Sequence, residues 1–203
     1  MTPDDVETFE RCISVGGVAL FPADTVYGLA TEPDSREGVA RLYRLKRRRP
    51  DKPSAVMFFR LESALAALPE LGARTRGVLE SLLPAPVTLL LPNPVHRYPL
   101  ACGNEPDKLG LRVPVLEGAL APLSAASWPV LQSSANLAGE PEASRVEDVD
   151  PELCGAVDLI VDAGELPGTP STVVDLSAWE EGGTFEVVRQ GALPLDAVVR
   201  CLR

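Results

Sequence analysis

The chain has few aromatic residues, one histidine and four scattered cysteines. Phe, Trp and Tyr make up 5% of the 203 residues, which argues against a platform on which single-stranded nucleic acid could stack. The only histidine, His96, lies in a proline-rich loop, so a Ser-His or Cys-His catalytic pair is not expected. The cysteines, at positions 12, 102, 154 and 201, form no C-x-x-C pair. Without this spacing, we expect no metal bound by protein ligands.

Targeting segments and familiar nucleotide-binding motifs are also absent. The N-terminus, Met-Thr-Pro-Asp-Asp, lacks the basic and apolar parts of a secretion signal, and no apolar run approaches the roughly 20 residues that span a bilayer. We therefore expect a cytoplasmic protein with free thiols and no membrane contact. The patterns G-x-x-x-x-G-K-[ST], G-x-G-x-x-G and G-x-S-x-G do not occur, which excludes the commonest phosphate loops and the serine-hydrolase elbow.

Positive charge is scarce and concentrated in one segment. The chain carries 19 Lys and Arg against 29 Asp and Glu, for a formal net charge of -10. Seven of the 19 cations fall within residues 41–53, which we call the basic segment. The acidic balance argues against broad duplex binding, which needs a basic face. The basic segment leaves open a weak local tRNA contact, or simply a helix end whose cations complement the helix dipole.

Hydrophobic patterning predicts helices mixed with short apolar strands. Thr2 caps a first helix over 3–15, whose buried face carries Val6, Phe9 and Ile13. Asp34 and Glu37 form an acidic capping box at the start of a helix that ends in the basic segment. Further helices are predicted over 61–83, with breaks at Pro69 and Gly72, and over 116–125, 146–153 and 194–202. Strands are predicted over 18–21, 55–59, 87–91, 109–113, 130–132, 157–161, 172–176 and 185–189, and a polar loop over 23–28. This mixture predicts an α/β fold with a mixed sheet flanked by helices, and no domain boundary is evident.

Short polar motifs follow the ends of several predicted strands and helices. They are Asp24-Thr25 with Tyr27, Lys46 with Arg48, Arg112, Ser133 to Asn136, Ser171-Thr172, and Arg189. Each alone has an ordinary structural explanation, because Ser and Asn build turns and arginine at a strand end extends to water. Together they supply four cations and several neutral donors, which polyphosphate and carboxylate ligands require. They include no general base, which suits a reaction driven by positioning and charge stabilisation.

These motifs resemble, in order, those of the YrdC-type threonylcarbamoyl-AMP synthases. The segment Phe21 to Leu29 is similar to the family signature Pro-Thr-(Asp/Glu)-Thr-Val-Tyr-Gly-Leu. The resemblance continues in Lys46-x-Arg48 with Lys52-Pro53, Pro84-Ala85-Pro86-Val87-Thr88, Leu111-Arg112-Val113-Pro114, Ser133-Ser134-Ala135-Asn136, Pro170 to Asp175, and Val188-Arg189-Gln190-Gly191. One such motif would be weak, but seven in the same order over residues 15–192 are highly specific.

The resemblance implies one YrdC-like domain over residues 1–203, with a twisted mixed sheet, a concave groove and no additional C-terminal domain. It implies a nucleotidyltransferase that converts L-threonine, bicarbonate and ATP, carried with Mg²⁺, to L-threonylcarbamoyl-AMP and pyrophosphate. This is the first step of tRNA N6-threonylcarbamoyladenosine modification, which a separate tRNA threonylcarbamoyl transferase completes. Two alternatives stay open: a carbamoyl-adenylating relative, and a double-stranded RNA- or tRNA-binding module without threonine activity.

The resemblance also implies roles for ten residues. Lys46 and Arg48 are the expected catalytic residues, which engage the ATP phosphates. The remaining expected ATP ligands are Ser134, Asn136, Ser171 and Arg189, and the expected threonine ligands are Asp24, Thr25, Tyr27 and Arg112. The chain departs from the family pattern at Ala23, where threonine is usual, and at Met57, where some members have histidine.

Overall fold

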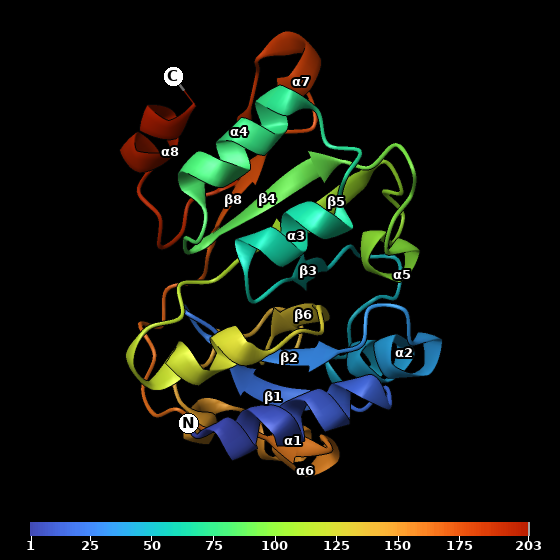
Figure 1. The fold of residues 1–203 in the computed structure, drawn as a ribbon. Coiled ribbons are helices and arrows are strands. Elements are labelled where there is room, and N and C mark those ends of the chain that lie inside the picture. The colour runs from blue at the N-terminus through green and yellow to red at the C-terminus, as the bar shows by residue number, and fades with distance from the viewer. Residues whose placement is uncertain (203) are drawn as a thin grey trace.

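One nine-stranded sheet runs through the molecule in the computed structural model, which describes residues 1–202 (Figure 1). The strands are β1 (Ala19–Pro22), β2 (Tyr27–Thr31), β3 (Ala55–Met57), β4 (Val87–Pro92), β5 (Lys108–Arg112), β6 (Val130–Ser134), β7 (Leu159–Ile160), β8 (Thr172–Asp175) and β9 (Glu186–Arg189). Their order is β7-β1-β2-β6-β3-β5-β4-β8-β9. Three neighbouring pairs are parallel and five are antiparallel, so the predicted α/β class with a mixed sheet is confirmed.

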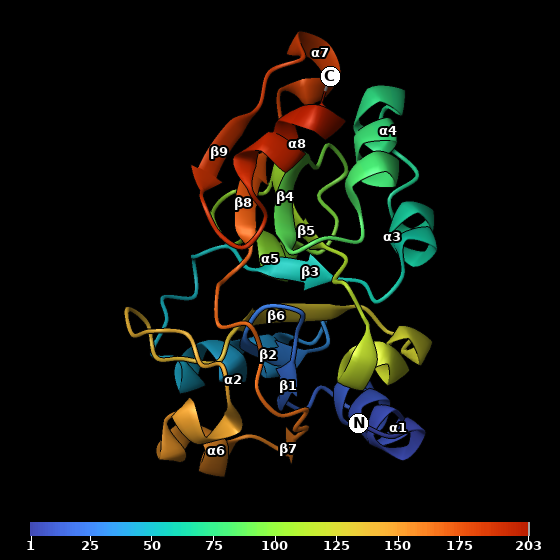
Figure 2. The same cartoon turned by 90° about the vertical axis from the view of Figure 1, so that its left-hand side faces the viewer.

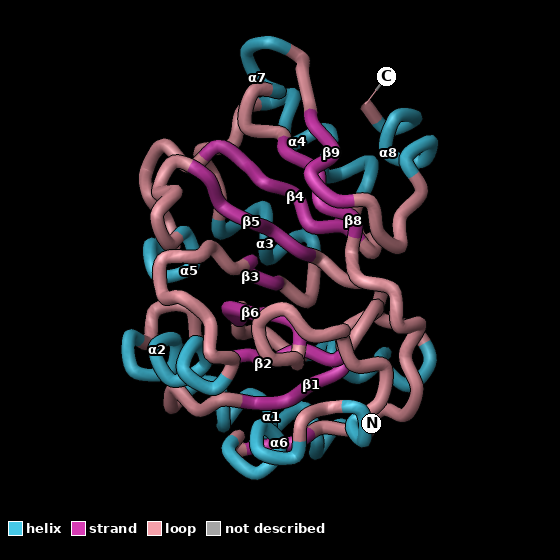
Figure 3. Tube along the Cα trace, turned by 180° about the vertical axis from the view of Figure 1, so that it is seen from behind, coloured by secondary structure: helices cyan, strands magenta, loops and turns pink. Residues whose placement is uncertain are grey.

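Helices pack around this sheet, and loops cover the centre of one of its faces. The α-helices are α1 (Pro3–Ser14), α2 (Arg36–Leu45), α3 (Leu61–Ala67), α4 (Ala73–Leu82), α5 (Pro99–Cys102), α6 (Pro151–Ala156), α7 (Trp179–Gly182) and α8 (Leu195–Cys201), and the 3-10 helices are η1 (Gly118–Ala125) and η2 (Val146–Asp148). The upper half of the sheet in Figure 1 carries α3 and α4, and the lower half carries α1, α2 and α6. Between β7 and β8 the chain crosses from one half to the other (Figure 2). Seen from behind, loops lie over the centre of the sheet (Figure 3).

Two hydrophobic cores lie on opposite sides of β1 and β2. Along these strands, Leu20 and Leu29 belong to the larger core, whereas Phe21 and Ala30 belong to the smaller one. Phe9 of α1 joins the smaller core, with its ring centroid 5.5 Å from that of Phe21. A strand covered on both faces is apolar at every position rather than at alternate ones. The continuous apolar run at 18–21 is therefore explained.

The starts of the first two long helices show which capping predictions were right. Thr2 caps α1 as predicted: its hydroxyl accepts from the Asp5 backbone N–H, and the Asp5 carboxylate accepts from the Thr2 N–H. The predicted capping box at Asp34 is wrong. Ser35 caps α2 instead, with its Oγ accepting from the Gly38 N–H at 3.1 Å. With this cap, the third helical position is Gly38. Glycine has no side chain that could accept a hydrogen bond from the Ser35 backbone N–H, so no capping box forms.

Replacing Ser35 with alanine is expected to lower the free energy of unfolding by about 1 kcal/mol, because the Gly38 N–H loses its acceptor. Urea denaturation measures this loss. The matched control is Asp34→Ala, which removes a neighbouring side chain that does not cap the helix and should change stability by less than about 0.5 kcal/mol. The reverse ranking of the two variants would contradict the cap at Ser35.

Other elements differ from the predictions in extent. The segment after β1, read as a loop, turns back within four residues and forms β2, which pairs antiparallel with β1. The helical prediction over 61–83 is interrupted as expected and yields α3 and α4. The predicted helix near 116–125 is the 3-10 helix η1, which contains Pro122. Proline lacks the N–H that an α-helix needs at an interior position. All four cysteines are free.

Candidate active site

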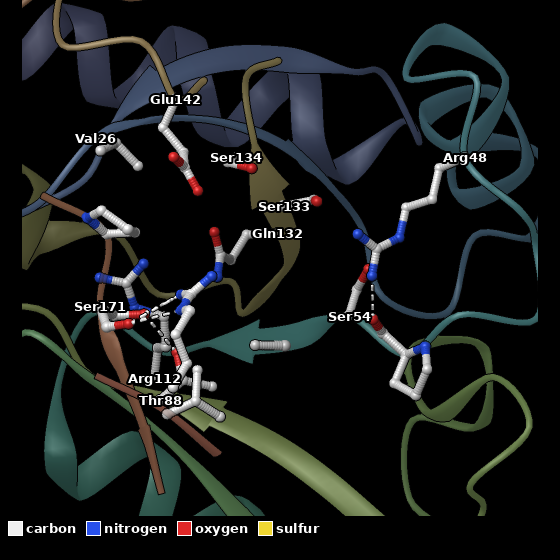
Figure 4. Close-up of a pocket in the computed structure, with 15 residues that line it drawn as sticks. Val26, Arg48, Ser54, Thr88, Arg112, Gln132, Ser133, Ser134, Glu142 and Ser171 are labelled. Atoms are coloured by element: carbon white, nitrogen blue, oxygen red, sulfur yellow. Dashed lines mark hydrogen bonds between the residues drawn. The ribbon is translucent and has the colours of Figure 1, made fainter. Parts of the chain in front are cut away.

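A polar cavity of about 250 Å³ lies where strands and loops from both halves of the sheet meet (Figure 4). Its walls come from β3, β4, β5, β6, β8 and β9 and from the loops before β2, β3 and β8. Three arginines line it, Arg48, Arg112 and Arg189, together with one carboxylate, Glu142. These residues are far apart in the sequence, and the fold brings them to one site.

Arg112 of β5 and Asp24 of the turn before β2 form a buried ion pair beside the cavity. Arg112 Nη2 donates to Asp24 Oδ1 at 2.6 Å and to Thr25 Oγ1 at 3.2 Å. The side chains of the pair are only 5% and 4% exposed. Burial raises the pKa of the Asp24 carboxyl, and the Arg112 guanidinium opposes that shift. Arg112 Nε is buried and has no hydrogen-bond partner within residues 1–202, and the residue itself lines the cavity.

Arg189 is held beside the cavity by Ser171, the residue just before β8. Its Nε and Nη2 donate to the backbone carbonyl of Ser171 at 3.2 and 2.9 Å. The Ser171 hydroxyl lies 2.9 Å from the Thr88 hydroxyl of β4. Because the carbonyl partner has no net charge, these bonds orient the guanidinium without neutralising it. Arg189 therefore remains available to an anion.

Lys46, which ends α2, supports the turn after β6 from behind. Its Nζ donates to the carbonyls of Ser134 and Asn136, the latter at 2.7 Å, and to Asn136 Oδ1 at 3.1 Å. An ammonium group has three donors, so all three are used. The residue is only 2% exposed. Burial and the neighbouring Arg48 guanidinium lower the pKa of Lys46 to about 8.

The fold brings nine of the ten predicted site residues together. The residues that line the cavity are Arg48, Arg112, Ser134, Ser171 and Arg189. Those that bond to or pair with lining residues from outside the cavity are Asp24, Thr25, Lys46 and Asn136. Tyr27 is placed differently: its hydroxyl lies 2.8 Å from both Asp162 Oδ1 and the Gly164 carbonyl, and burial raises its pKa to about 12. Tyr27 thus anchors the loop that leads to Ser171.

The lining residues that were not predicted include Gln132 of β6 and Glu142 of the following loop. Gln132 is a polar residue at the end of an apolar strand segment, and that interruption is a signal that could have identified it. Glu142 is one of 29 acidic residues and has no local pattern that distinguishes it from a surface carboxylate. Its position in the cavity depends on the path of the loop, which sequence patterning does not reveal.

Three of the seven cations of the basic segment form ion pairs within the protein. Ion pairs join Arg41 to Asp158 at 2.5 Å, Arg47 to Glu152 at 3.3 Å and Arg49 to Asp51 at 2.5 Å. The Arg48 Nη2 donates to the Pro53 carbonyl at 2.6 Å. These pairs offset positive charge that an RNA-binding surface would need, so the structure favours the cavity over the segment as the functional feature.

Residues 1–202 contain neither a cluster of metal-ligating side chains nor a helix that could cross a membrane. No cluster of three or more His, Cys, Asp or Glu side chains there is arranged to hold a metal ion. None of the helices in that range combines the length and the apolarity that crossing a bilayer requires.

Known proteins resemble this chain in sequence and in fold. A threonylcarbamoyl-AMP synthase of Xanthomonas axonopodis pv. citri is 35% identical over 163 residues, covering 78% of this chain and 85% of the relative. A threonylcarbamoyl-AMP synthase of Pyrococcus abyssi is 28% identical over 191 residues, covering 94% of this chain and 55% of the relative. The chain thus spans about half the length of the Pyrococcus protein.

A solved structure and a family model agree with these relatives. The crystal structure of Pyrococcus abyssi Sua5 in complex with L-threonine matches with a TM-score of 0.86 and 27% identity, covering 99% of this chain and 58% of that one. The model of the Sua5/YciO/YrdC family, described as "Telomere recombination", matches residues 11–191. Because this match covers most of the chain, and the fold agrees with it, the chain belongs to the Sua5/YciO/YrdC family.

Proposed function

We propose that the chain is a threonylcarbamoyl-AMP synthase, which condenses L-threonine, bicarbonate and ATP to L-threonylcarbamoyl-AMP and pyrophosphate. The observation that carries this proposal is the convergence of Arg48, Arg112 and Arg189 on one polar cavity. Each substrate is an anion or carries a carboxylate, and arginine binds phosphates and carboxylates through paired donors. The relatives named threonylcarbamoyl-AMP synthase support the same assignment.

In this proposal, Arg112 binds the threonine carboxylate, and Arg48 and Arg189 bind the ATP phosphates. The turn at Ser134 and Asn136, which Lys46 holds in place, supports the nucleotide. The threonine amine, once it has lost its extra proton, combines with bicarbonate to form N-carboxythreonine and water. A carbamate oxygen then attacks the α-phosphate, and pyrophosphate leaves as the bond to the β-phosphate breaks. Negative charge grows on the phosphoryl oxygens, and cations already oriented toward them stabilise that transition state.

Mg²⁺ would enter this site with the triphosphate. The cavity offers one carboxylate, Glu142, which does not make a protein-ligated metal site. Mg²⁺ commonly keeps several waters and binds mainly to substrate phosphates. We therefore treat the ion as part of the nucleotide substrate. The product would pass to a separate transferase that modifies tRNA, in the cytoplasm where ATP and tRNA are available.

Pyrophosphate release from ATP tests the proposed function directly. The protein, ATP and Mg²⁺ are incubated with threonine and bicarbonate, and in parallel reactions either threonine or bicarbonate is omitted. Pyrophosphate release should require both threonine and bicarbonate, and mass spectrometry should detect the threonylcarbamoyl-adenylate. Release that is equal with and without threonine would remove the substrate assignment.

Turnover should fall as the pH rises above about 8, where the Lys46 ammonium begins to lose its proton. The sign follows from the direction of the shift. Because the pKa of Lys46 is lowered from 10.5, its ammonium is deprotonated at a lower pH than an ordinary lysine. The neutral amine no longer supplies three donors to the Ser134–Asn136 turn. The measurement is kcat/KM for pyrophosphate release between about pH 6.5 and 9.5. In Lys46→Arg, whose side chain stays charged, this decline should disappear, and its persistence would assign it to another group.

A further inference from the structure

The loop after β6 places a lone carboxylate in a cavity that otherwise carries cations. Glu142 is half-buried and lines the cavity with Arg48, Arg112 and Arg189. Within residues 1–202 it makes no hydrogen bond or ion pair. In the close-up its carboxylate points inward from the same side as Val26, while Arg112 is drawn on the other side of the cavity (Figure 4). The cavity therefore carries one negative side chain among three positive ones.

A carboxylate at this position repels a phosphate placed directly beside it, because like charges repel. No cation within residues 1–202 forms an ion pair with Glu142, although the buried Lys46 ammonium is close enough for the two charges to attract. All three donors of Lys46 are used by Ser134 and Asn136, and Arg112 is paired with Asp24. A positive group on a ligand would therefore give Glu142 its first direct partner.

We propose that Glu142 binds the ammonium group of the amino-acid substrate and so selects an α-amino acid over acids that lack the amine. This inference rests on the proposed function and adds a residue to it. A free amino acid is a zwitterion, so it carries one charge for the arginines and one for Glu142. Its carboxylate would bind the Arg112 guanidinium, which lines the cavity, and its ammonium would lie toward Glu142. The amine is thereby held by Glu142 while Arg112 fixes the carboxylate.

Discrimination between L-threonine and its 2-hydroxy analogue, 2,3-dihydroxybutanoate of matching configuration, tests this role. The analogue keeps the carboxylate and the side chain and replaces only the amine. Isothermal calorimetry measures the dissociation constants of both compounds without nucleotide or Mg²⁺. The wild type should bind threonine at least about tenfold more tightly, as expected for a charged hydrogen bond. In Glu142→Gln the ratio of the two dissociation constants, analogue over threonine, should fall to about threefold or less, because an amide keeps the shape of the carboxylate but loses its charge.

The matched control is Glu140→Gln, which makes the same change at an exposed position in the same loop. Its ratio should equal that of the wild type. Because the ratio compares two ligands on one protein sample, partial unfolding of a variant does not alter it. An unchanged ratio in Glu142→Gln would overturn the proposal.

Two further outcomes separate the alternatives. If Glu142→Gln keeps the ratio but needs more Mg²⁺ for pyrophosphate release, Glu142 faces the ion of the nucleotide, and the amine proposal is overturned. If the wild type shows the ratio and Glu142→Gln loses it, yet no threonine-dependent pyrophosphate is released, Glu142 is supported as an amine-binding residue. The synthase activity proposed above would then be the part that fails.

Discussion

Replacing Lys46 with alanine is expected to reduce threonine-dependent pyrophosphate release by roughly a hundredfold or more, the effect of losing a preorganised donor or cation at a transition state. The ammonium is buried and holds the backbone carbonyls of Ser134 and Asn136. Its loss removes positive charge near the phosphates and leaves these carbonyls without their donor. Steady-state kinetics of pyrophosphate release gives kcat and kcat/KM, and both should fall.

The neighbouring cation provides the control for Lys46→Ala. Arg47 carries the same charge, but its side chain is 70% exposed and pairs with Glu152 at the surface. Arg47→Ala should therefore retain turnover within about twofold, since exposed ion pairs contribute little. Thermal melts of both variants show whether they are folded at the assay temperature. Wild-type turnover in a folded Lys46→Ala variant would contradict a role for Lys46 in the reaction.

Arg112→Ala should lower the free energy of unfolding by about 3–5 kcal/mol, because it leaves the buried Asp24 carboxylate without its cation. It should also abolish threonine-dependent pyrophosphate release, since the donor proposed for the substrate carboxylate is lost. Urea denaturation measures the stability and the pyrophosphate assay measures the function. The surface pair Arg49–Asp51 is the comparison: Arg49 is 74% exposed, and Arg49→Ala should cost less than about 1 kcal/mol.

A double variant separates the two roles of Arg112. In Asp24→Asn with Arg112→Met, neither charge remains, so most of the lost stability should return. Activity should not return, because the substrate still lacks its cation. Recovery of both stability and threonine-dependent pyrophosphate release would show that Arg112 serves only to neutralise Asp24.

The fold was largely predictable where local chemistry decides it. Thr2 and Asp5 cap α1 as neighbours in the sequence, and the strand at 18–21 is apolar because both of its faces are covered. Prediction failed where tertiary contacts decide. Either Asp34 or Ser35 could cap α2, and only the structure shows that Ser35 does. Tyr27 and Gly28 were predicted to lie in a polar loop, yet they begin β2, which pairs with β1 and β6 and is fully buried.

The candidate site was predictable to the extent that short motifs carry it. The arginines at 48, 112 and 189 were singled out by their positions at the ends of elements, and they meet in one cavity. Pairing across long sequence separations was not predictable: Arg112 lies 88 residues from Asp24. For the same reason, sequence could not show that the Tyr27 hydroxyl contacts Asp162 rather than the cavity. Glu142 enters the site through the course of a loop.

The central claim is that one cavity holds a nucleotide tail beside an amino acid, and a crystal structure with both ligands tests it most directly. Crystals would be grown with L-threonine, Mg²⁺ and an ATP analogue that resists cleavage. We expect phosphate density within hydrogen-bonding distance of Arg48 and Arg189, and the threonine carboxylate at Arg112. Well-defined density for either ligand at a site that none of these three arginines contacts would contradict the account.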